Sequence, residues 1–132
     1  MDCSKPFCTI LHVDDDVNML NSVRRQLRKE PYQVVSVRTA KDALKLSKLL
    51  RFDLAVLDVN LSGTNGFRLL KKLRAQQQQL PVIFLSGLQE ECLFYRAFPS
   101  PEPVIVQKQE SALNFKNMVK TILKNPETHP EV

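Results

Sequence analysis

The chain has 132 residues, of which 43% are hydrophobic and 25% are charged, and this composition is typical of one soluble globular domain. No apolar run approaches the roughly 20 residues of a membrane-spanning helix, and the first residues do not resemble a secretory signal. The three cysteines are an odd number with no zinc-like spacing, which favours free thiols in a reducing compartment. We therefore expect a cytoplasmic protein with no membrane partner.

The net charge of +5 comes from 19 basic and 14 acidic residues. A basic chain can bind nucleic acid, and the densest basic group here is Arg24, Arg25, Arg28 and Lys29. No aromatic residues interleave these charges, as they do in a groove that binds single strands. The group therefore favours a solvated helix face, and we expect no direct contact with nucleic acid.

Short apolar runs alternate with amphipathic segments along most of the chain. In chain order, the pattern predicts a strand at 9–13, a helix at 14–29, a strand at 33–37, a helix at 39–50 and a strand at 53–57. A turn at 61–66 comes next, followed by a helix at 67–75, a strand at 81–85, a helix at 89–98, a strand at 104–106 and a helix at 111–123.

Strands that alternate with helices, and that are apolar enough to be buried on both faces, indicate parallel β-α-β units. We therefore predict an α/β fold, a doubly wound five-stranded parallel sheet with five helices. The domain would span residues 9–124, after an N-terminal extension at 1–8 and before a flexible tail or linker start at 125–132. Asp16 and Thr39 are predicted helix N-caps. Residues predicted to face the core from the first and last helices are Leu20, Val23, Leu27, Phe115, Val119 and Ile122.

Polar residues stand where four of the predicted strands end. Asp14 and Asp15 follow the first strand, Asp58 the third, Ser86 the fourth and Lys108 the fifth. The carboxyl ends of parallel strands meet at one edge of a sheet, and ligands bind there, at the switch in strand order. Clustered carboxylates repel one another unless a cation or proton is bound, and hard oxygen ligands suit Mg²⁺. With a lysine and a hydroxyl nearby, the group suits phosphoryl transfer to a carboxylate nucleophile.

Each of these residues also has a purely structural interpretation. An aspartate run before a helix is often an N-cap, which is our interpretation of Asp16. Asp58 alone would fit a turn, Ser86 a helix cap and Lys108 a solvated surface position. Their joint placement at four strand ends favours a functional site. His12, on a predicted buried strand, is interpreted as a core histidine and not as a source of phosphate.

This pattern resembles the response-regulator receiver family of two-component signalling, over about residues 9–124. The spacing is 43 residues from Asp15 to Asp58, 28 to Ser86 and 22 to Lys108, all ordinary for that family. The stretch LAVLDVNLSGTNGFRLLKKLR is especially similar, with Gly66 eight residues after the aspartate. The resemblance implies a flavodoxin-like fold.

The resemblance also implies the role of each site residue. Asp58 would be the phosphoacceptor, Lys108 would pair with the phosphoryl group, and Ser86 would donate a hydrogen bond to it. Asp15 and Asp58 would bind Mg²⁺ directly. The last two metal-site residues would be Asn60, through its backbone carbonyl, and Asp14, through water.

Partners follow from the same resemblance. The donor would be a phosphohistidine on a sensor histidine kinase or a phosphotransfer protein. An effector domain or protein would bind the segment from Gln89 to Phe98 and the fifth strand and helix, and a homodimer is possible in principle. The domain would be regulatory and not an enzyme, beyond Mg²⁺-dependent self-phosphorylation and autodephosphorylation.

Several positions depart from the family pattern. Ser62 stands where a proline usually follows the acceptor, Ile105 replaces the usual Tyr or Phe before the lysine, and Gln109 replaces a cis-proline after it. Because Ile105 has no aromatic ring, we expect phosphorylation to move the loop after the fourth strand while position 105 stays nearly still. The departures leave open a pseudo-receiver, which would bind proteins without being phosphorylated. A metal-dependent phosphatase is a weaker alternative, because Asn60 stands where one such family has a second aspartate.

Overall fold

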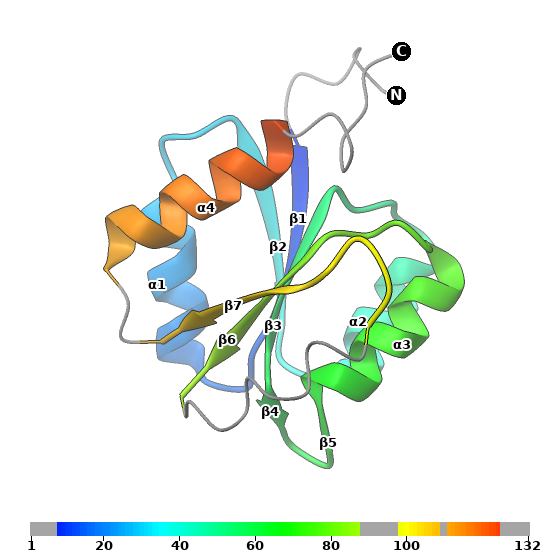
Figure 1. Ribbon diagram of the computed structural model, residues 1–132. Coiled ribbons are helices and arrows are strands. Elements are labelled where there is room, and N and C mark those ends of the chain that lie inside the picture. Colours follow the sequence, from blue (N-terminus) through cyan, green and yellow to red (C-terminus); the bar gives the residue numbers. More distant parts are fainter. Residues whose placement is uncertain (1–7, 88–97, 109–110, 125–132) are drawn as a thin grey trace.

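The computed structural model describes residues 8–87, 98–108 and 111–124 of the chain. Five parallel strands form one sheet in the order β2-β1-β3-β6-β7 (Figure 1). β2 therefore lies on one side of β1, and β3, β6 and β7 follow in chain order on the other side. The strands are β1 (Cys8–Val13), β2 (Tyr32–Val37), β3 (Leu54–Asp58), β6 (Val82–Ser86) and β7 (Val104–Gln107).

Two layers of helices cover this sheet, which confirms the predicted doubly wound α/β fold. The helices are α1 (Val17–Leu27), α2 (Ala40–Ser47), α3 (Gly66–Gln76) and α4 (Ala112–Lys124). In Figure 1, α1 and α4 lie on one face and α2 and α3 on the other. The described residues contain these four helices; the fourth predicted helix, at 89–98, lies outside them except for its last residue. In the described residues, no helix combines the length and the apolar character needed to cross a bilayer.

The helices begin at capping residues that the sequence shows. The side chains of Asp16 and Thr39 accept hydrogen bonds from backbone N–H groups at 2.9 and 3.0 Å, so both predicted N-caps are confirmed. Asn65 caps α3 in the same way, accepting from the N–H of Arg68 at 2.9 Å. Such caps satisfy N–H groups that have no partner within the helix itself.

The apolar faces agree with the prediction in α1 and differ by one position in α4. Leu20, Val23 and Leu27 are buried as predicted. In α4 the fully buried stripe is Phe115, Val119 and Leu123, whereas Ile122, predicted to face inward, is half-buried. The buried residues follow a strict i, i+4, i+8 spacing, which keeps one narrow face of the helix against the sheet.

A small hairpin follows β3, where the sequence predicted only a turn. It pairs β4 (Asn60–Leu61) with β5 (Thr64–Asn65), and Gly63 adopts a positive φ of 77° at its tip. Gly66, the residue that begins α3, packs so closely that an added Cβ would overlap the backbone carbonyl oxygen of Asp58. The hairpin is thus held tightly against the end of β3.

The proline-rich segment before β7 is held by a long-range contact. The Arg74 guanidinium donates to the carbonyl oxygens of Leu80 at 2.9 Å, Pro99 at 3.1 Å and Pro101 at 2.6 Å. Just before this segment, Phe98 is buried, with its ring centroid 6.1 Å from those of both Phe67 and Phe84. These contacts tie the segment to α3 and to the sheet.

The burial of Phe98 corrects part of one prediction. We expected the segment from Gln89 to Phe98 to bind an effector, which requires its side chains to be exposed. Phe98 instead belongs to the core between α3 and β6. The rest of that predicted surface lies outside the described residues.

Candidate functional site

The reversal in strand order brings the ends of β1 and β3 together. Asp14 and Asp15 come directly after β1, and Asp58 is the last residue of β3. Each of these carboxylates offers an oxygen, and the three oxygens all lie within 4.8 Å of one another. The structure therefore assembles the acidic cluster that the strand ends predict.

Lys108 reaches this cluster from the end of β7, the edge strand of the sheet. It follows β7, and its backbone N–H donates to the carbonyl of Ser86 at 2.9 Å. Its Nζ lies 3.1 Å from Oδ2 of Asp58 and 4.0 Å from Oδ2 of Asp14. The ammonium group is thus closer to Asp58 than to Asp14. Among the described residues, Lys108 is the one cationic side chain that contacts Asp58.

Ser86 and Asn60 lie at the same edge of the sheet. Ser86 is the buried last residue of β6, the strand that pairs with β3. Asn60 is exposed in the hairpin, and its backbone N–H donates to Oδ1 of Asp58 at 3.2 Å. The five predicted side chains and the Asn60 backbone therefore occupy one end of the sheet.

Burial sets the electrostatics of the carboxylates. Asp14 is fully buried, and this burial raises its pKa to about 6. Burial also raises the pKa of Asp58, and the adjacent Lys108 only partly offsets that effect. For Lys108, burial lowers the pKa of the ammonium group, but its contact with Asp58 and the charges of Asp14 and Asp16 together outweigh burial and raise it. Both carboxyls therefore bind a proton more readily than an exposed aspartate does.

The donor set fits a hard divalent cation. Oδ1 of Asp14 accepts from the N–H of Asp16 at 2.9 Å, but Oδ2 is buried without a hydrogen-bond partner among the described residues. A buried carboxylate oxygen of this kind is costly unless it binds a proton or a cation. Together with Asp15 and Asp58, it offers the oxygen ligands that Mg²⁺ prefers.

A contact of Asp15 was missed in the sequence. The Ser62 hydroxyl, at the tip of the hairpin, donates to Oδ2 of Asp15 at 2.9 Å. The sequence singled out Ser62 only as a missing proline, and nothing in its neighbourhood points to a partner 47 residues away.

His12 lies buried on β1 beside the cluster, and its prediction as a core histidine is confirmed. Burial, with smaller effects of Lys108 and Arg24, lowers the pKa of the imidazole to about 4. Neither ring nitrogen has a hydrogen-bond partner in the described part of the chain. The ring is neutral at pH 7.

Ile105, which stands where the family usually has Tyr or Phe, lies close to several aromatic side chains. Ile105 is half-buried and packs against the same core as Phe67 and Phe84. Those two rings have centroids 4.7 Å apart. The neighbouring aromatic rings come from α3, from β6 and from the segment before β7.

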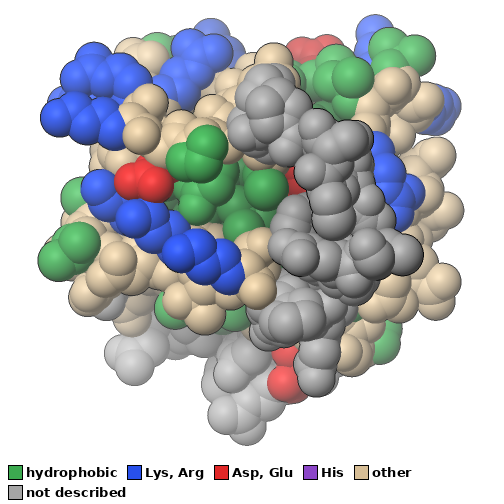
Figure 2. All heavy atoms as spheres, turned by 90° about the horizontal axis from the view of Figure 1, so that it is seen from above, with side chains coloured by type: hydrophobic (Ala, Val, Ile, Leu, Met, Phe, Trp, Pro, Cys, Tyr) green, Lys and Arg blue, Asp and Glu red, His purple; other side chains and the backbone are tan. Residues whose placement is uncertain are grey.

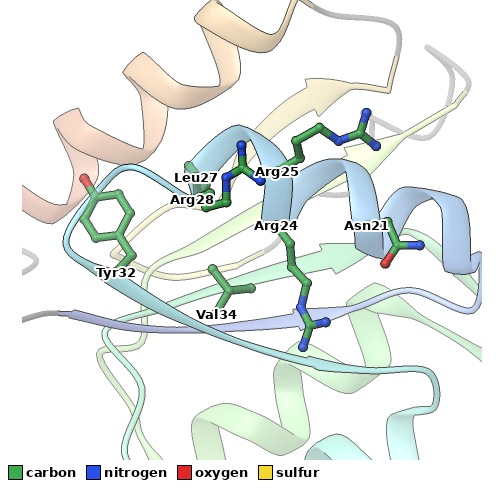
Figure 3. Close-up of a pocket in the computed structure, with 7 residues that line it drawn as sticks. All are labelled: Asn21, Arg24, Arg25, Leu27, Arg28, Tyr32 and Val34. Atoms are coloured by element: carbon green, nitrogen blue, oxygen red, sulfur yellow. The ribbon is translucent and has the colours of Figure 1, made fainter.

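Basic residues gather away from the acidic cluster. Figure 2 looks down from the end at which β1 begins, and there Lys and Arg side chains surround an apolar patch on one side. A shallow hollow of about 480 Å³ lies between α1 and β2, and Figure 3 draws the residues that line it. Glu30, which follows α1, contacts Lys116 and Lys120 of α4 at 3.7 and 3.5 Å. Among the described residues, none that lines the hollow is acidic; the lining residues are Asn21, Arg24, Arg25, Leu27, Arg28, Tyr32 and Val34.

Comparisons with known proteins agree with this geometry. The cell cycle response regulator CtrA of Brucella ovis is 29% identical over 79 residues, which cover 60% of this chain and 34% of CtrA. The match thus spans about a third of the length of the curated relatives. A CheY-like receiver domain protein from Methanospirillum hungatei JF-1 is 27% identical, with a TM-score of 0.78 over 89% of this chain and 94% of that one.

A receiver domain of an HD domain-containing protein from Pseudomonas fluorescens Pf-5 has the same fold, with a TM-score of 0.81 at 23% identity over 91% of this chain and 89% of that one. The family model of the response regulator receiver domain matches residues 10–120. That match covers most of the chain and contains every residue of the acidic cluster and Lys108. The chain belongs to the response regulator receiver domain family.

Proposed function

We propose that this receiver domain accepts a phosphoryl group on Asp58 and changes its partner binding in response. The observation that supports Asp58 is its double contact. It shares the acidic cluster with Asp14 and Asp15, and its Oδ2 lies 3.1 Å from Nζ of Lys108. A carboxylate between a cation site and an ammonium group is well placed to attack phosphorus.

In the proposed reaction, a carboxylate oxygen of Asp58 forms a bond to the phosphorus of a partner's phosphohistidine. The phosphorus–nitrogen bond breaks, and the imidazole leaves and takes up a proton. Mg²⁺ would neutralise charge on the phosphoryl oxygens while held by Asp15, Asp58 and the Asn60 carbonyl, with Asp14 acting through water. Lys108 would pair with the same oxygens, and the Ser86 hydroxyl would donate to one of them.

The partners and cellular setting belong to this proposal as well. A sensor histidine kinase or phosphotransfer protein would supply the phosphoryl group in the cytoplasm. The signal would pass to an effector through residues 89–97, β7 and α4. The domain would be a regulatory switch whose own chemistry is limited to assisting its phosphorylation and dephosphorylation.

Labelling with a small phosphodonor tests the assignment of Asp58. The protein is incubated with acetyl phosphate and Mg²⁺, and the added mass is located by mass spectrometry. The wild type should gain one phosphoryl group on Asp58, and Asp58→Asn should gain none. Asp16→Asn is the matched control, because asparagine is an equally good N-cap and Asp16 lies outside the cluster. Equal labelling of Asp58→Asn at another residue would show that the acceptor is misassigned.

One observation favours the alternative of a pseudo-receiver. Ile105 takes the place of the aromatic side chain that in the family follows the movement of the hydroxyl residue. A folded wild-type protein that gains no phosphoryl group, even at high phosphodonor and Mg²⁺ concentrations, would support that alternative.

A further inference from the structure

The hairpin that carries Ser62 connects two loops of the site. Ser62 and Gly63 form the two-residue link between β4 and β5. From there the Ser62 Oγ donates to Oδ2 of Asp15, in the loop after β1, at 2.9 Å. This hydrogen bond joins the loop after β1 to the loop after β3, on either side of the acidic cluster.

The backbone fixes where this hydroxyl lies. Gly63 adopts a φ of 77°, which glycine tolerates and which allows the chain to reverse within two residues. Behind the hairpin, Gly66 lies directly against the carbonyl of Asp58, and its N–H donates to the carbonyl of Val59 at 2.7 Å. The hairpin therefore has little freedom relative to β3, and Ser62 is held over Asp15.

Asp15 has few other contacts to orient it. Lys108 reaches Asp58 and Asp14, at 3.1 and 4.0 Å. Among the described residues, Ser62 is the one side chain that donates a hydrogen bond to the Asp15 carboxylate. A proline at position 62 has no donor, so the serine adds a hydrogen bond that the usual family residue is unable to make.

We propose that Ser62 is a positioning residue for the divalent cation. Its hydroxyl would hold Oδ2 of Asp15 and leave the other oxygen of that carboxylate to serve as a metal ligand. Hydrogen bonds to metal-binding carboxylates fix their orientation, and losing such a partner weakens metal binding. This proposal rests on the proposed function, because it takes the acidic cluster to be the Mg²⁺ site.

Metal affinity measures the effect without any phosphorylation step. We would titrate the full chain with Mn²⁺, following free Mn²⁺ by electron paramagnetic resonance, and with Mg²⁺ by calorimetry. Ser62→Ala should raise the dissociation constant about 3- to 10-fold, which is less than the roughly 10- to 100-fold typical of buried partners because this contact is solvent-exposed. Ser62→Thr should restore most of the affinity, because threonine keeps the hydroxyl.

Thr64→Ala is the matched control, because it removes a hydroxyl from the same hairpin without touching Asp15. Its affinity should equal that of the wild type. A thermal melt of each variant confirms that it is folded. In labelling with acetyl phosphate, Ser62→Ala should be slower at low Mg²⁺ and equal to the wild type at saturating Mg²⁺.

The outcomes separate this proposal from the proposed function. Unchanged affinity in Ser62→Ala, or an equal loss in Thr64→Ala, overturns the role of Ser62 even if Asp58 is labelled. A wild type that binds no divalent cation at millimolar concentration also overturns it. Cation binding that depends on Ser62, in a protein that is never labelled on Asp58, supports the role of Ser62 and contradicts the phosphoacceptor function.

Discussion

Charge is packed in opposite ways at the acidic cluster and at the arginine-lined hollow of α1. Asp14 and Asp58 are 0% and 3% exposed, and their carboxylates lie against each other and against Lys108. Arg24 and Arg25 are exposed to solvent on α1, and the hollow that they line is open (Figure 3). The acidic cluster thus holds like charges close together and buried, whereas the arginines of the hollow are exposed to solvent.

The two regions differ in how much their charges cost the folded protein. A buried carboxylate loses hydration and raises the free energy of the folded state unless a partner compensates. Exposed arginines keep their hydration and contribute little in either direction. Buried, closely spaced ionisable groups with raised pKa values therefore mark the candidate site, and the exposed arginines of the hollow do not.

The largest effect should come from the buried ring of His12, next to the cluster. Its pKa is lowered to about 4 in the folded protein, so between pH 6.5 and 4 the unfolded chain binds the extra proton. The free energy of unfolding should therefore fall as the pH falls through this range, by about 3 kcal/mol at roughly 1.4 kcal/mol per pKa unit. Urea unfolding of the wild type and His12→Leu at several pH values measures this, and the variant should lack that part of the decline. Parallel curves for the two proteins would show that His12 is not buried in its neutral form.

Asp14 should show the opposite sign. Its pKa is raised to about 6 in the folded protein, so between pH 4 and 6 the folded chain binds the extra proton, and the free energy of unfolding falls as the pH rises. At pH 7.5 without metal, Asp14→Asn should be more stable than the wild type by up to about 3 kcal/mol, at roughly 1.4 kcal/mol per pKa unit. The asparagine keeps an oxygen for the N–H of Asp16. A destabilised Asp14→Asn protein would mean that the charge at position 14 is compensated in the metal-free protein.

A smaller effect is expected from Mg²⁺. Binding to the folded state alone should add about 1 kcal/mol at a several-fold excess over the dissociation constant, which is a shift of a few degrees in the thermal midpoint. The rise should vanish in Asp15→Asn, which removes a carboxylate from the cluster. If the wild type and Asp15→Asn respond alike to Mg²⁺ in thermal melts, the cation binds elsewhere.

The smallest effect is expected in the hollow. Arg25→Ala removes an exposed charge and places a better helix former in α1. The free energy of unfolding should change by less than about 0.5 kcal/mol, measured by urea unfolding at pH 7.5. A loss of more than about 1 kcal/mol would contradict the contrast between the two regions.

The sequence predicts this site well because its members sit at strand ends. In a parallel sheet, the order of the chain decides that Asp14, Asp58, Ser86 and Lys108 reach one edge, whatever the details of packing. The strands and the helix caps at Asp16 and Thr39 could also be predicted. Strands are marked by short apolar runs, and caps by the residue type just before a helix, so both can be read from the local sequence.

Features that depend on contacts between distant side chains were not predictable in this way. The hydrogen bond from Ser62 to Asp15, the contacts of Arg74 with the proline-rich segment and the burial of Phe98 each join residues far apart in the chain. The burial of Leu123 in place of Ile122 depends on how α4 is rotated against the sheet. Periodicity fixes that rotation only to within about one residue.

Helix α3 touches the site at one end and the support of β7 at the other. Gly66 begins the helix against the Asp58 carbonyl, and Arg74, eight residues and about 12 Å further along, holds the carbonyl of Pro101 just before β7. At its far end β7 leads to Lys108, whose ammonium group returns to Asp58. Asp58 and Lys108 are thus connected twice, directly through their ion pair and indirectly through α3, Arg74 and β7.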